Sequence, residues 1–184
     1  MTAPFVEELL LDAHDSALEL LRLAYKEALR SPDPSTQNGV LICQGRKILQ
    51  YGHNHFPEGV RDDIPERWER PAKYGFIEHG ERDAVYAAAR EGTATCNGTM
   101  YACWAACDDC ARAIIGAGIT EVYTHLNSLA ETRFGIKVNE TWKAPIIRGI
   151  TMFNEAKIPV YCVTNKLFQP GELEILFQGE KCQP

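Results

Sequence analysis

TMYACWAACDDCARAIIGAGITEVYTH, residues 99–125, is predicted to form a strand, a helix and a second strand in immediate succession. Residues 99–104 are the first strand, the helix starts near Cys107 and ends at Gly116 or Gly118, and residues 120–125 are the second strand. A strand that returns to the same sheet through one helix runs parallel to the first, by a right-handed crossover. The stretch therefore predicts an α/β fold with a largely parallel sheet.

Elements on either side extend this unit. Three further strands are predicted at residues 159–164, 38–43 and 47–52, the last two forming an antiparallel hairpin around Gly45. Three further helices are predicted to begin near Ser16, His79 and Pro145. Strands that alternate with helices favour helices on both faces of the sheet. We expect a three-layer α/β/α sandwich around a central, mixed five-stranded sheet.

The composition is typical of a single globular domain that binds a small molecule. The 184 residues are 45% hydrophobic and 24% charged, and the net charge of −6 comes without a dense run of Lys or Arg. Because proteins that bind a phosphate backbone are basic, nucleic acid is not an expected partner. No segment reaches the roughly 18 apolar residues of a membrane span, and the start has no basic leader. We expect no membrane association and a cytoplasmic location.

The chain is expected to hold one catalytic domain, over residues 1–165. Residues 166–184 are expected to be an extension, either a mobile tail or an added strand. The chain has seven cysteines and no export signal, which favours thiols and metal ligands over disulfides.

Three cysteines in residues 99–125 can be grouped in more than one way. Cys103, Cys107 and Cys110 have the C-x3-C-x2-C spacing that radical-SAM enzymes use for an iron–sulfur cluster. Cys107 and Cys110 alone form a C-x2-C pair, which suits zinc or redox chemistry. In the first turn of a helix these two sulfurs share one face, and the positive helix end favours thiolates. Cys103, on the strand, is expected to be a buried apolar side chain.

His79 and Glu81 favour the zinc interpretation. They stand at the start of the predicted helix over residues 79–92, at the same sheet edge as Cys107. Being two residues apart, they can face one cleft only if His79 lies just before the regular helix. One imidazole and two thiolates suit zinc and leave a fourth position for water. We predict a catalytic zinc held by His79, Cys107 and Cys110, with Glu81 as its acid and base.

These motifs resemble those of a known enzyme family. EHGERDA (78–84) and CDDCARAII (107–115) are similar to the H-x-E and C-x-x-C motifs of the zinc-dependent cytidine/deoxycytidylate deaminase superfamily. DPSTQNGVLI (33–42) and YGHNHFPEG (51–59) resemble its deoxycytidylate deaminase branch. The resemblance implies conversion of dCMP to dUMP and ammonia, with zinc-activated water attacking C4 and Glu81 protonating N3 and the departing ammonia.

The resemblance also implies substrate contacts and regulation. Asn54 matches an asparagine that contacts the sugar, and the backbone N–H of Gly80 matches a donor to the pyrimidine carbonyl. The branch implies a homo-oligomer, specifically a hexamer. It further implies activation by dCTP, bound with Mg2+, and inhibition by dTTP.

Three positions depart from the family pattern. Gly80 stands where Ala is usual, Ala106 where Pro is usual, and Asp83 where Asn is usual. A carboxylate at Asp83 would repel the substrate's phosphate if it lay beside it. Other substrates therefore stay open: a modified cytosine nucleotide, a free nucleoside or a tRNA adenosine. A nucleotide-binding relative without turnover is the non-enzymatic alternative.

The long connection over residues 53–78 is expected to bind substrate or cover the site, because idle loops of that length are rare. Lys73 and Tyr74 are its candidates for contacting the substrate, and its other charged residues are expected to be solvated. Trp104 is a candidate wall for the base. His53 and His55 flank Asn54, so a second metal or a phosphate contact there also stays open.

Overall fold

The computed structural model describes residues 10–11, 15–125, 140–163 and 166–184. Its main sheet has the strand order β1-β6-β5-β4-β2-β3. The strands are β1 (Leu10–Leu11), β2 (Gly39–Gln44), β3 (Lys47–His53), β4 (Thr99–Ala102), β5 (Glu121–His125) and β6 (Val160–Val163). The five predicted strands are all present, and the two-residue β1 pairs with β6 at the edge. β4, β5 and β6 are parallel, whereas β2 is antiparallel to both β3 and β4, so the predicted mixed sheet is confirmed.

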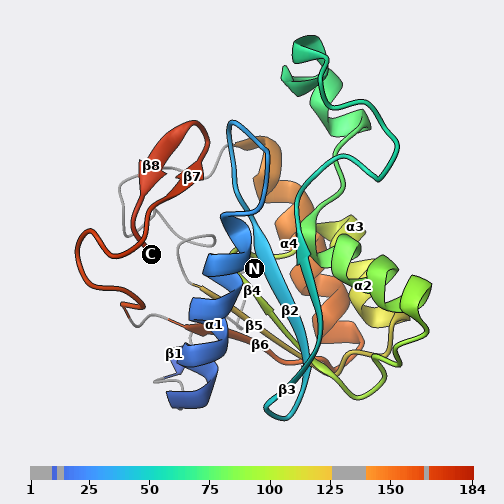
Figure 1. Cartoon of the computed structure of the whole chain (residues 1–184). Helices are drawn as coiled ribbons and strands as arrows, with labels where there is room; N and C mark the ends of the chain where they lie inside the picture. Colours follow the sequence, from blue (N-terminus) through green and yellow to red (C-terminus); the bar gives the residue numbers. More distant parts are fainter. Residues whose placement is uncertain (1–9, 12–14, 126–139, 164–165) are drawn as a thin grey trace.

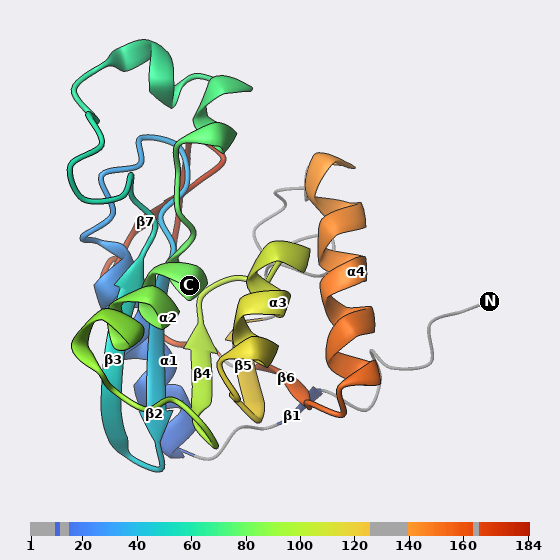
Figure 2. The same ribbon diagram turned by 90° about the vertical axis from the view of Figure 1, so that its right-hand side faces the viewer.

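Helices cover both faces of this sheet, as predicted (Figures 1 and 2). They are α1 (Asp15–Ala28), α2 (Gly80–Glu91), α3 (Asp108–Gly116) and α4 (Glu140–Glu155). Figure 1 shows α1 on one side of the strands and α2, α3 and α4 on the other. The helix predicted to begin near Pro145 instead begins at Glu140 and holds Pro145 inside it. None of the described helices is both long and apolar enough to cross a membrane.

The side chains of β2 alternate between two halves of the core, one on each face of the sheet. Leu41 and Cys43 pack with α1, and Val40 and Ile42 pack with residues of α2, α3 and α4. All four side chains are fully buried. Successive residues of a strand point to opposite faces, so a central strand between two helix layers is apolar throughout.

Two glycines let helices approach the hairpin β2–β3 closely. A Cβ on Gly39 would lie 1.9 Å from the carbonyl oxygen of Ala24 in α1. A Cβ on Gly52 would lie 2.4 Å from the carbonyl oxygen of Gly80, at the start of α2. Any larger residue would push a helix away from the sheet, so these positions fix the depth at which α1 and α2 pack.

The extension at residues 166–184 forms a hairpin of its own, with β7 at Ile175–Phe177 and β8 at Glu180–Cys182. It is neither a mobile tail nor a strand added to the main sheet. Its apolar side chains Leu167, Phe168, Leu173, Ile175 and Cys182 are buried in the same core half as α1. Backbone bonds from Gln37 N–H to Leu176 O (2.9 Å) and from Gly179 N–H to Ser35 O (2.7 Å) attach the hairpin to the segment before β2.

The connection over residues 54–78 contains two short 3-10 helices, η1 (Pro65–Trp68) and η2 (Ala72–Gly75). In Figure 1 it extends beyond the upper ends of β2 and β3. Its last residues return to the sheet through a bridge between His55 and Glu78, immediately before α2. The loop therefore ends where the predicted functional residues begin.

Candidate active site

His79, Cys107 and Cys110 meet at the N-terminal ends of two helices. His79 is the N-cap of α2, with extended backbone (φ −84°, ψ 149°), and Cys107 is the N-cap of α3. His79 therefore lies at the junction before the regular helix, the condition under which it and Glu81 can share a cleft. Cys110 lies in the first turn of α3. Within the described ranges, these three are the group of His, Cys, Asp or Glu residues whose ligand atoms all lie within 4.8 Å of one another.

The spacing of the three ligand atoms fits tetrahedral zinc. His79 Nδ1 lies 3.6 Å from Cys107 Sγ and 3.5 Å from Cys110 Sγ, and the two sulfurs are 3.6 Å apart. Around a tetrahedral zinc with ordinary bond lengths, two sulfurs would be about 3.8 Å apart, and nitrogen and sulfur about 3.6 Å. The three side chains thus stand at the corners of a zinc-sized tetrahedron, and the fourth corner has no protein ligand from this group.

Electrostatics in the cluster favour metal binding. The hydrogen bond with Cys110, and then that with His79, lower the pKa of Cys107 to about 4, against the effect of its burial. The same sulfur–sulfur bond and burial raise the pKa of Cys110. Burial lowers the pKa of His79, but the hydrogen bond with Cys107 and the charge of Glu81 outweigh it, and the net shift is upward. One sulfur is therefore already a thiolate, the form that binds zinc.

Cys103 stands apart from this cluster. It follows β4 directly, is fully buried, and its backbone N–H donates to Gly39 O at 3.2 Å. Burial raises the pKa of its thiol far above the usual range, so the side chain is a neutral apolar group. It is absent from the group of candidate ligands found among the described residues.

Glu81 lies in the first turn of α2 beside the cluster, and only 2% of it is exposed. Its Oε2 accepts a hydrogen bond from Asn38 Nδ2 at 3.0 Å and lies 3.6 Å from Cys110 Sγ. Burial is the main reason that the pKa of this carboxyl lies above its usual value. A carboxyl with a raised pKa can both take and return a proton near neutral pH.

A pocket opens over the cluster and Glu81. It is lined by the predicted residues Asn54, Lys73, Tyr74, His79, Glu81, Trp104 and Cys107. It is also lined by Asp33, Thr36, Asn38, Arg70, Ile77, Ala105, Trp142, Ile146, Phe177 and Gln178. The wall comes from the segment before β2, the long connection, α4 and the C-terminal hairpin. Gly80 is buried and is not among the lining residues.

A buried ion pair occupies the polar side of the pocket. Lys73 Nζ lies 2.5 Å from Asp33 Oδ2, and both side chains are almost fully buried. Burial lowers the pKa of Lys73, whereas its bond with Asp33 opposes that shift. Asn54 Nδ2 donates to Asp33 Oδ2 at 2.8 Å and to Thr36 O at 2.7 Å, and Asn54 Oδ1 accepts from Asn38 N–H at 2.7 Å. Both amide hydrogens of Asn54 are thus already used.

Aromatic rings form the other side of the pocket. Trp104 packs against Phe177 with ring centroids 4.4 Å apart, and its Nε1–H donates to Gln37 O at 2.8 Å. The ring of Trp142 contacts those of Tyr74 and His79, with ring centroids 5.5 Å and 5.4 Å apart. Trp104 belongs both to the core half that contains α1 and to the pocket wall.

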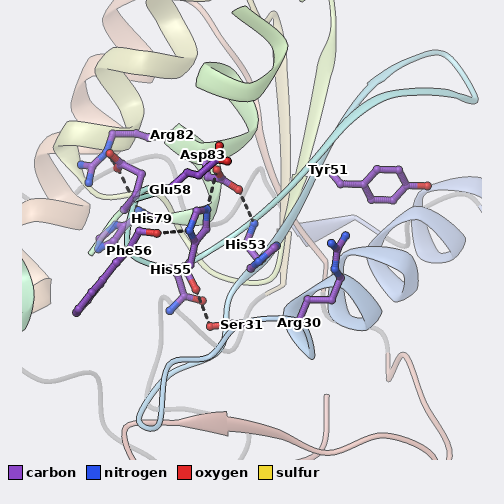
Figure 3. Close-up of polar contacts among 12 residues, drawn as sticks. Arg30, Ser31, Tyr51, His53, His55, Phe56, Glu58, His79, Arg82 and Asp83 are labelled. Atoms are coloured by element: carbon purple, nitrogen blue, oxygen red, sulfur yellow. Dashed lines mark hydrogen bonds and ion pairs between the residues drawn. The ribbon is translucent and has the colours of Figure 1, made fainter. Parts of the chain in front are cut away.

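Asp83 lies outside the pocket. Its Oδ1 pairs with His55 Nε2 at 2.9 Å and its Oδ2 accepts from the His53 backbone N–H at 3.1 Å, as Figure 3 shows. His53 Nδ1 pairs instead with Glu27 Oε1 at 2.9 Å. The carboxylate at this position joins α2 to the end of β3 and does not face the pocket. The two imidazoles bind different carboxylates, and nothing in the described part of the chain groups them into a second metal site.

Comparison with known proteins identifies the family. The model of the cytidine and deoxycytidylate deaminase zinc-binding region matches residues 14–126. The chain belongs to the cytidine and deoxycytidylate deaminase family. The match includes α1, the hairpin β2–β3 and all three candidate zinc ligands.

Curated relatives within this deaminase family share about a third of the aligned residues. Human deoxycytidylate deaminase is 35% identical over 109 residues, which are 55% of this chain and 60% of the human protein. A probable deoxycytidylate deaminase of Caenorhabditis elegans is 33% identical over 108 residues, 56% of this chain and 53% of that protein. The match thus spans little more than half the length of these relatives.

A solved structure of the family confirms the fold. The dCMP deaminase of cyanophage S-TIM5 superposes in its apo form with a TM-score of 0.58 at 19% identity, covering 82% of this chain and 99% of that one. Its complex with dCMP and dUMP gives a TM-score of 0.56 at 18% identity, with 88% and 99% coverage. The similarity in fold therefore extends well beyond the zinc-binding motifs.

Ten of the pocket-lining residues were not among the predicted site residues, and four of them are informative. Asn38, Trp142, Phe177 and Gln178 all line the pocket. Asn38 stands in the quoted motif DPSTQNGVLI, so its closeness to the site had a signal. The other three come from α4 and the hairpin, far from any motif, and only the tertiary fold brings them here.

Proposed function

We propose that this chain is a zinc-dependent hydrolytic deaminase that converts dCMP to dUMP and ammonia. One observation carries the proposal: a zinc-sized His/Cys/Cys cluster lies in contact with a buried carboxyl, with Cys110 Sγ 3.6 Å from Glu81 Oε2, under an aromatic pocket. The names of the human relative and of the cyanophage enzyme favour dCMP over other amino-bearing bases.

His79, Cys107 and Cys110 would hold the zinc, and Glu81 would move the protons. When bound, zinc supplies the Lewis acidity that makes water a nucleophile at neutral pH. Glu81 would take one proton from the attacking water on its carboxylate and deliver it to N3 of the base. It would then take the proton left on the oxygen added at C4 and pass it to the amino group, which leaves as ammonia while C4 keeps a carbonyl oxygen. The low exposure of Glu81 keeps bulk water from competing for these protons.

The pocket residues would orient the nucleotide. Trp104 and Trp142 would bracket the base. The family resemblance assigns the pyrimidine carbonyl to the backbone N–H of Gly80, which stands between the lining residues His79 and Glu81. Asn54 would accept a hydrogen bond from the sugar through its free Oδ1 lone pair, because both of its amide hydrogens bind protein oxygens.

The phosphate would be met by Arg70 and Tyr74 at the rim, with Lys73 behind them. Arg70 packs over the Tyr74 ring with its guanidinium carbon 6.0 Å from the ring centroid, and its Nη2 donates to Ser35 Oγ at 3.1 Å. The Lys73 charge is balanced by Asp33 at 2.5 Å, so Lys73 contributes by holding the loop around Asp33 in place.

We further propose a cytoplasmic homo-oligomer, specifically a hexamer, that dCTP with Mg2+ activates and dTTP inhibits. The family resemblance supports this part of the proposal. Sedimentation equilibrium with and without each nucleotide tests it, and a monomer in every condition would refute it.

An ammonia-release panel tests the reaction itself. It compares dCMP, CMP, deoxycytidine, 5-substituted dCMP and adenine nucleotides, with dCTP and dTTP added separately. Fastest release from dCMP is expected. Silence across the panel with about one zinc bound per chain would instead favour a binding protein without turnover.

Glu81→Gln is the matched variant for this panel. Glutamine keeps the shape and a hydrogen-bonding oxygen but cannot accept and return a proton, so ammonia release should stop while zinc content stays near one per chain. Zinc is measured by atomic emission. Retained turnover would refute the assigned acid and base role.

A further inference from the structure

Asn38 is fixed between the two polar groups on which the proposed reaction depends. It directly precedes β2 and is 7% exposed. Its backbone N–H donates to Asn54 Oδ1 at 2.7 Å and its carbonyl accepts from Asn54 N–H at 3.2 Å. Its side-chain Nδ2 donates to Glu81 Oε2 at 3.0 Å. The backbone is thus held by Asn54, and the side chain is held against Glu81.

The orientation of the Asn38 amide follows from this contact. Glu81 must be a carboxylate to take a proton from water, and a carboxylate only accepts hydrogen bonds. In that state the NH2 group faces Glu81, because the opposite orientation would place two acceptor oxygens together. The amide oxygen is therefore directed away from that carboxylate oxygen. Asn54 holds the backbone of Asn38 in place. The Asn38 amide therefore cannot exchange the positions of its oxygen and nitrogen without losing the bond to Glu81.

The Asn38 oxygen has no partner in the described part of the chain. Oδ1 is buried and accepts no hydrogen bond, and the residue lines the pocket. Thr124 Oγ1, on β5, is the other such atom among the described residues, but Thr124 does not line the pocket. A buried acceptor left without a donor is costly, so such an atom in a pocket-lining residue calls for a donor from a ligand or a bound water.

The chemistry of the proposed reaction supplies a donor for this oxygen. Cytosine carries an amino group at C4, which donates hydrogen bonds, whereas uracil carries a carbonyl there, which accepts them. We infer that Asn38 is a positioning and specificity residue: its NH2 holds the Glu81 carboxylate toward C4, and its Oδ1 accepts from the substrate's amino group. The same oxygen faces a carbonyl after the reaction, so it disfavours the product and promotes its release. This inference rests on the proposed function.

Kinetics of Asn38→Leu test the inference, because leucine has nearly the same shape but no polar atom. In the wild type, the inhibition constant for dUMP should exceed KM for dCMP. In Asn38→Leu, kcat should fall at least about tenfold, and the ratio of the dUMP constant to KM should also fall about tenfold. Asn38→Ala serves as the second variant if leucine prevents folding, which circular dichroism and zinc content monitor.

Thr124→Val is the matched control, because it removes the other unpartnered buried oxygen at a residue outside the pocket. It should leave both the ratio and kcat unchanged. A merely structural role for Asn38 would weaken dCMP and dUMP binding equally and leave the ratio alone, and that result would overturn the inference. So would an unchanged kcat and ratio in Asn38→Leu.

Failure of the proposed function gives a different result from failure of this inference. If the wild type releases no ammonia from dCMP, the proposed function fails, and both nucleotides can then be titrated at equilibrium by quenching of Trp104 and Trp142 fluorescence. The wild type should still prefer dCMP to dUMP, and Asn38→Leu should lose that preference. Equal binding of the two nucleotides by the wild type would overturn the inference in that case.

Discussion

Cys107 and Cys110 differ in protonation although both belong to the start of α3. The pKa of Cys107 falls to about 4 while that of Cys110 rises, because one proton shared along the sulfur–sulfur contact stabilises only one thiolate. Zinc requires both sulfurs as thiolates, so binding must release the proton from Cys110. We therefore expect zinc binding to need both Cys107 and Cys110, and not the neutral, buried Cys103.

Serine substitutions separate these roles. Cys110→Ser should lose the metal, because a serine hydroxyl is a poor zinc ligand, whereas Cys103→Ser should keep about one zinc per chain. Cys96→Ser, at an exposed thiol, is the control for handling and oxidation. Atomic emission on purified protein measures the zinc, and loss of metal from Cys103→Ser would contradict the assignment.

The His55–Asp83 pair makes folding stability depend on pH. The hydrogen bond with Asp83 is the main reason that the pKa of His55 is raised, against the effect of burial. A raised folded-state pKa stabilises the protein fully below the unfolded value of about 6.5 and loses that effect as pH rises through the folded-state value. The contribution of Asp83 should therefore be larger at pH 5.5 than at pH 8.5.

Asp83→Asn tests this and restores the residue usual in the family. Asparagine still accepts from the His53 backbone N–H but has no charge, so the pH-dependent part should disappear. Urea unfolding should show the wild type more stable than the variant by about 1 kcal/mol at pH 5.5, shrinking toward zero at pH 8.5. A difference that is constant across this range would refute the pairing of a charged His55 with Asp83.

At the scale of elements, the position of α2 depends on Gly52. α2 carries Glu81 and begins directly after His79, so displacement of this helix moves both. The added Cβ of Gly52→Ala would lie 2.4 Å from Gly80 O and 2.6 Å from Ala84 N, both backbone atoms that cannot turn aside. We expect a loss of stability of about 1–3 kcal/mol, together with reduced zinc content and activity.

Gly116→Ala is the control for this substitution. A Cβ at Gly116 meets no atom within 4 Å, and the residue lies at the end of α3. Alanine there should be neutral or slightly stabilising. Urea unfolding and metal analysis compare the two variants, and normal zinc content in Gly52→Ala would show that α2 tolerates the shift.

The elements differ in how far their sequences predict them. The strands and helices of residues 38–52 and 79–125 were predictable because apolar runs, glycines and caps lie within each element. The hairpin β7–β8 was not, because its short strands pair only with each other and its burial depends on α1, more than 140 residues earlier. The start of α4 was missed because Pro145 favours a helix start locally, whereas here a preceding turn continues through it.

The candidate site divides in the same way. His79, Glu81, Cys107 and Cys110 were predictable because each pair is close in sequence and the topology brings two helix starts to one sheet edge. Phe177 and Trp142 reach the pocket only through packing of the hairpin and α4, and no local pattern marks them. Lys73 was found as a pocket residue, but its partner Asp33, 40 residues earlier, could not be read from spacing.

For the whole molecule, a zinc ion would add a link between α2 and α3, which already pack in the same core half. His79 comes from the start of α2, while both cysteines come from α3, which packs against α4. Zinc that binds only the folded chain stabilises it by about 4 kcal/mol when its concentration is 1,000 times Kd. For a domain of this size that corresponds to about 10 °C in melting temperature.

Removal of the metal with a chelator should therefore lower the melting temperature by that amount, and added zinc should restore it. In Cys110→Ser the melting temperature should be low and independent of zinc, because the tetrahedron has lost a corner. Equal melting temperatures of the chelated and zinc-loaded wild type would mean that α2 and α3 are already held in place by packing alone, and that the cluster contributes chemistry but not stability.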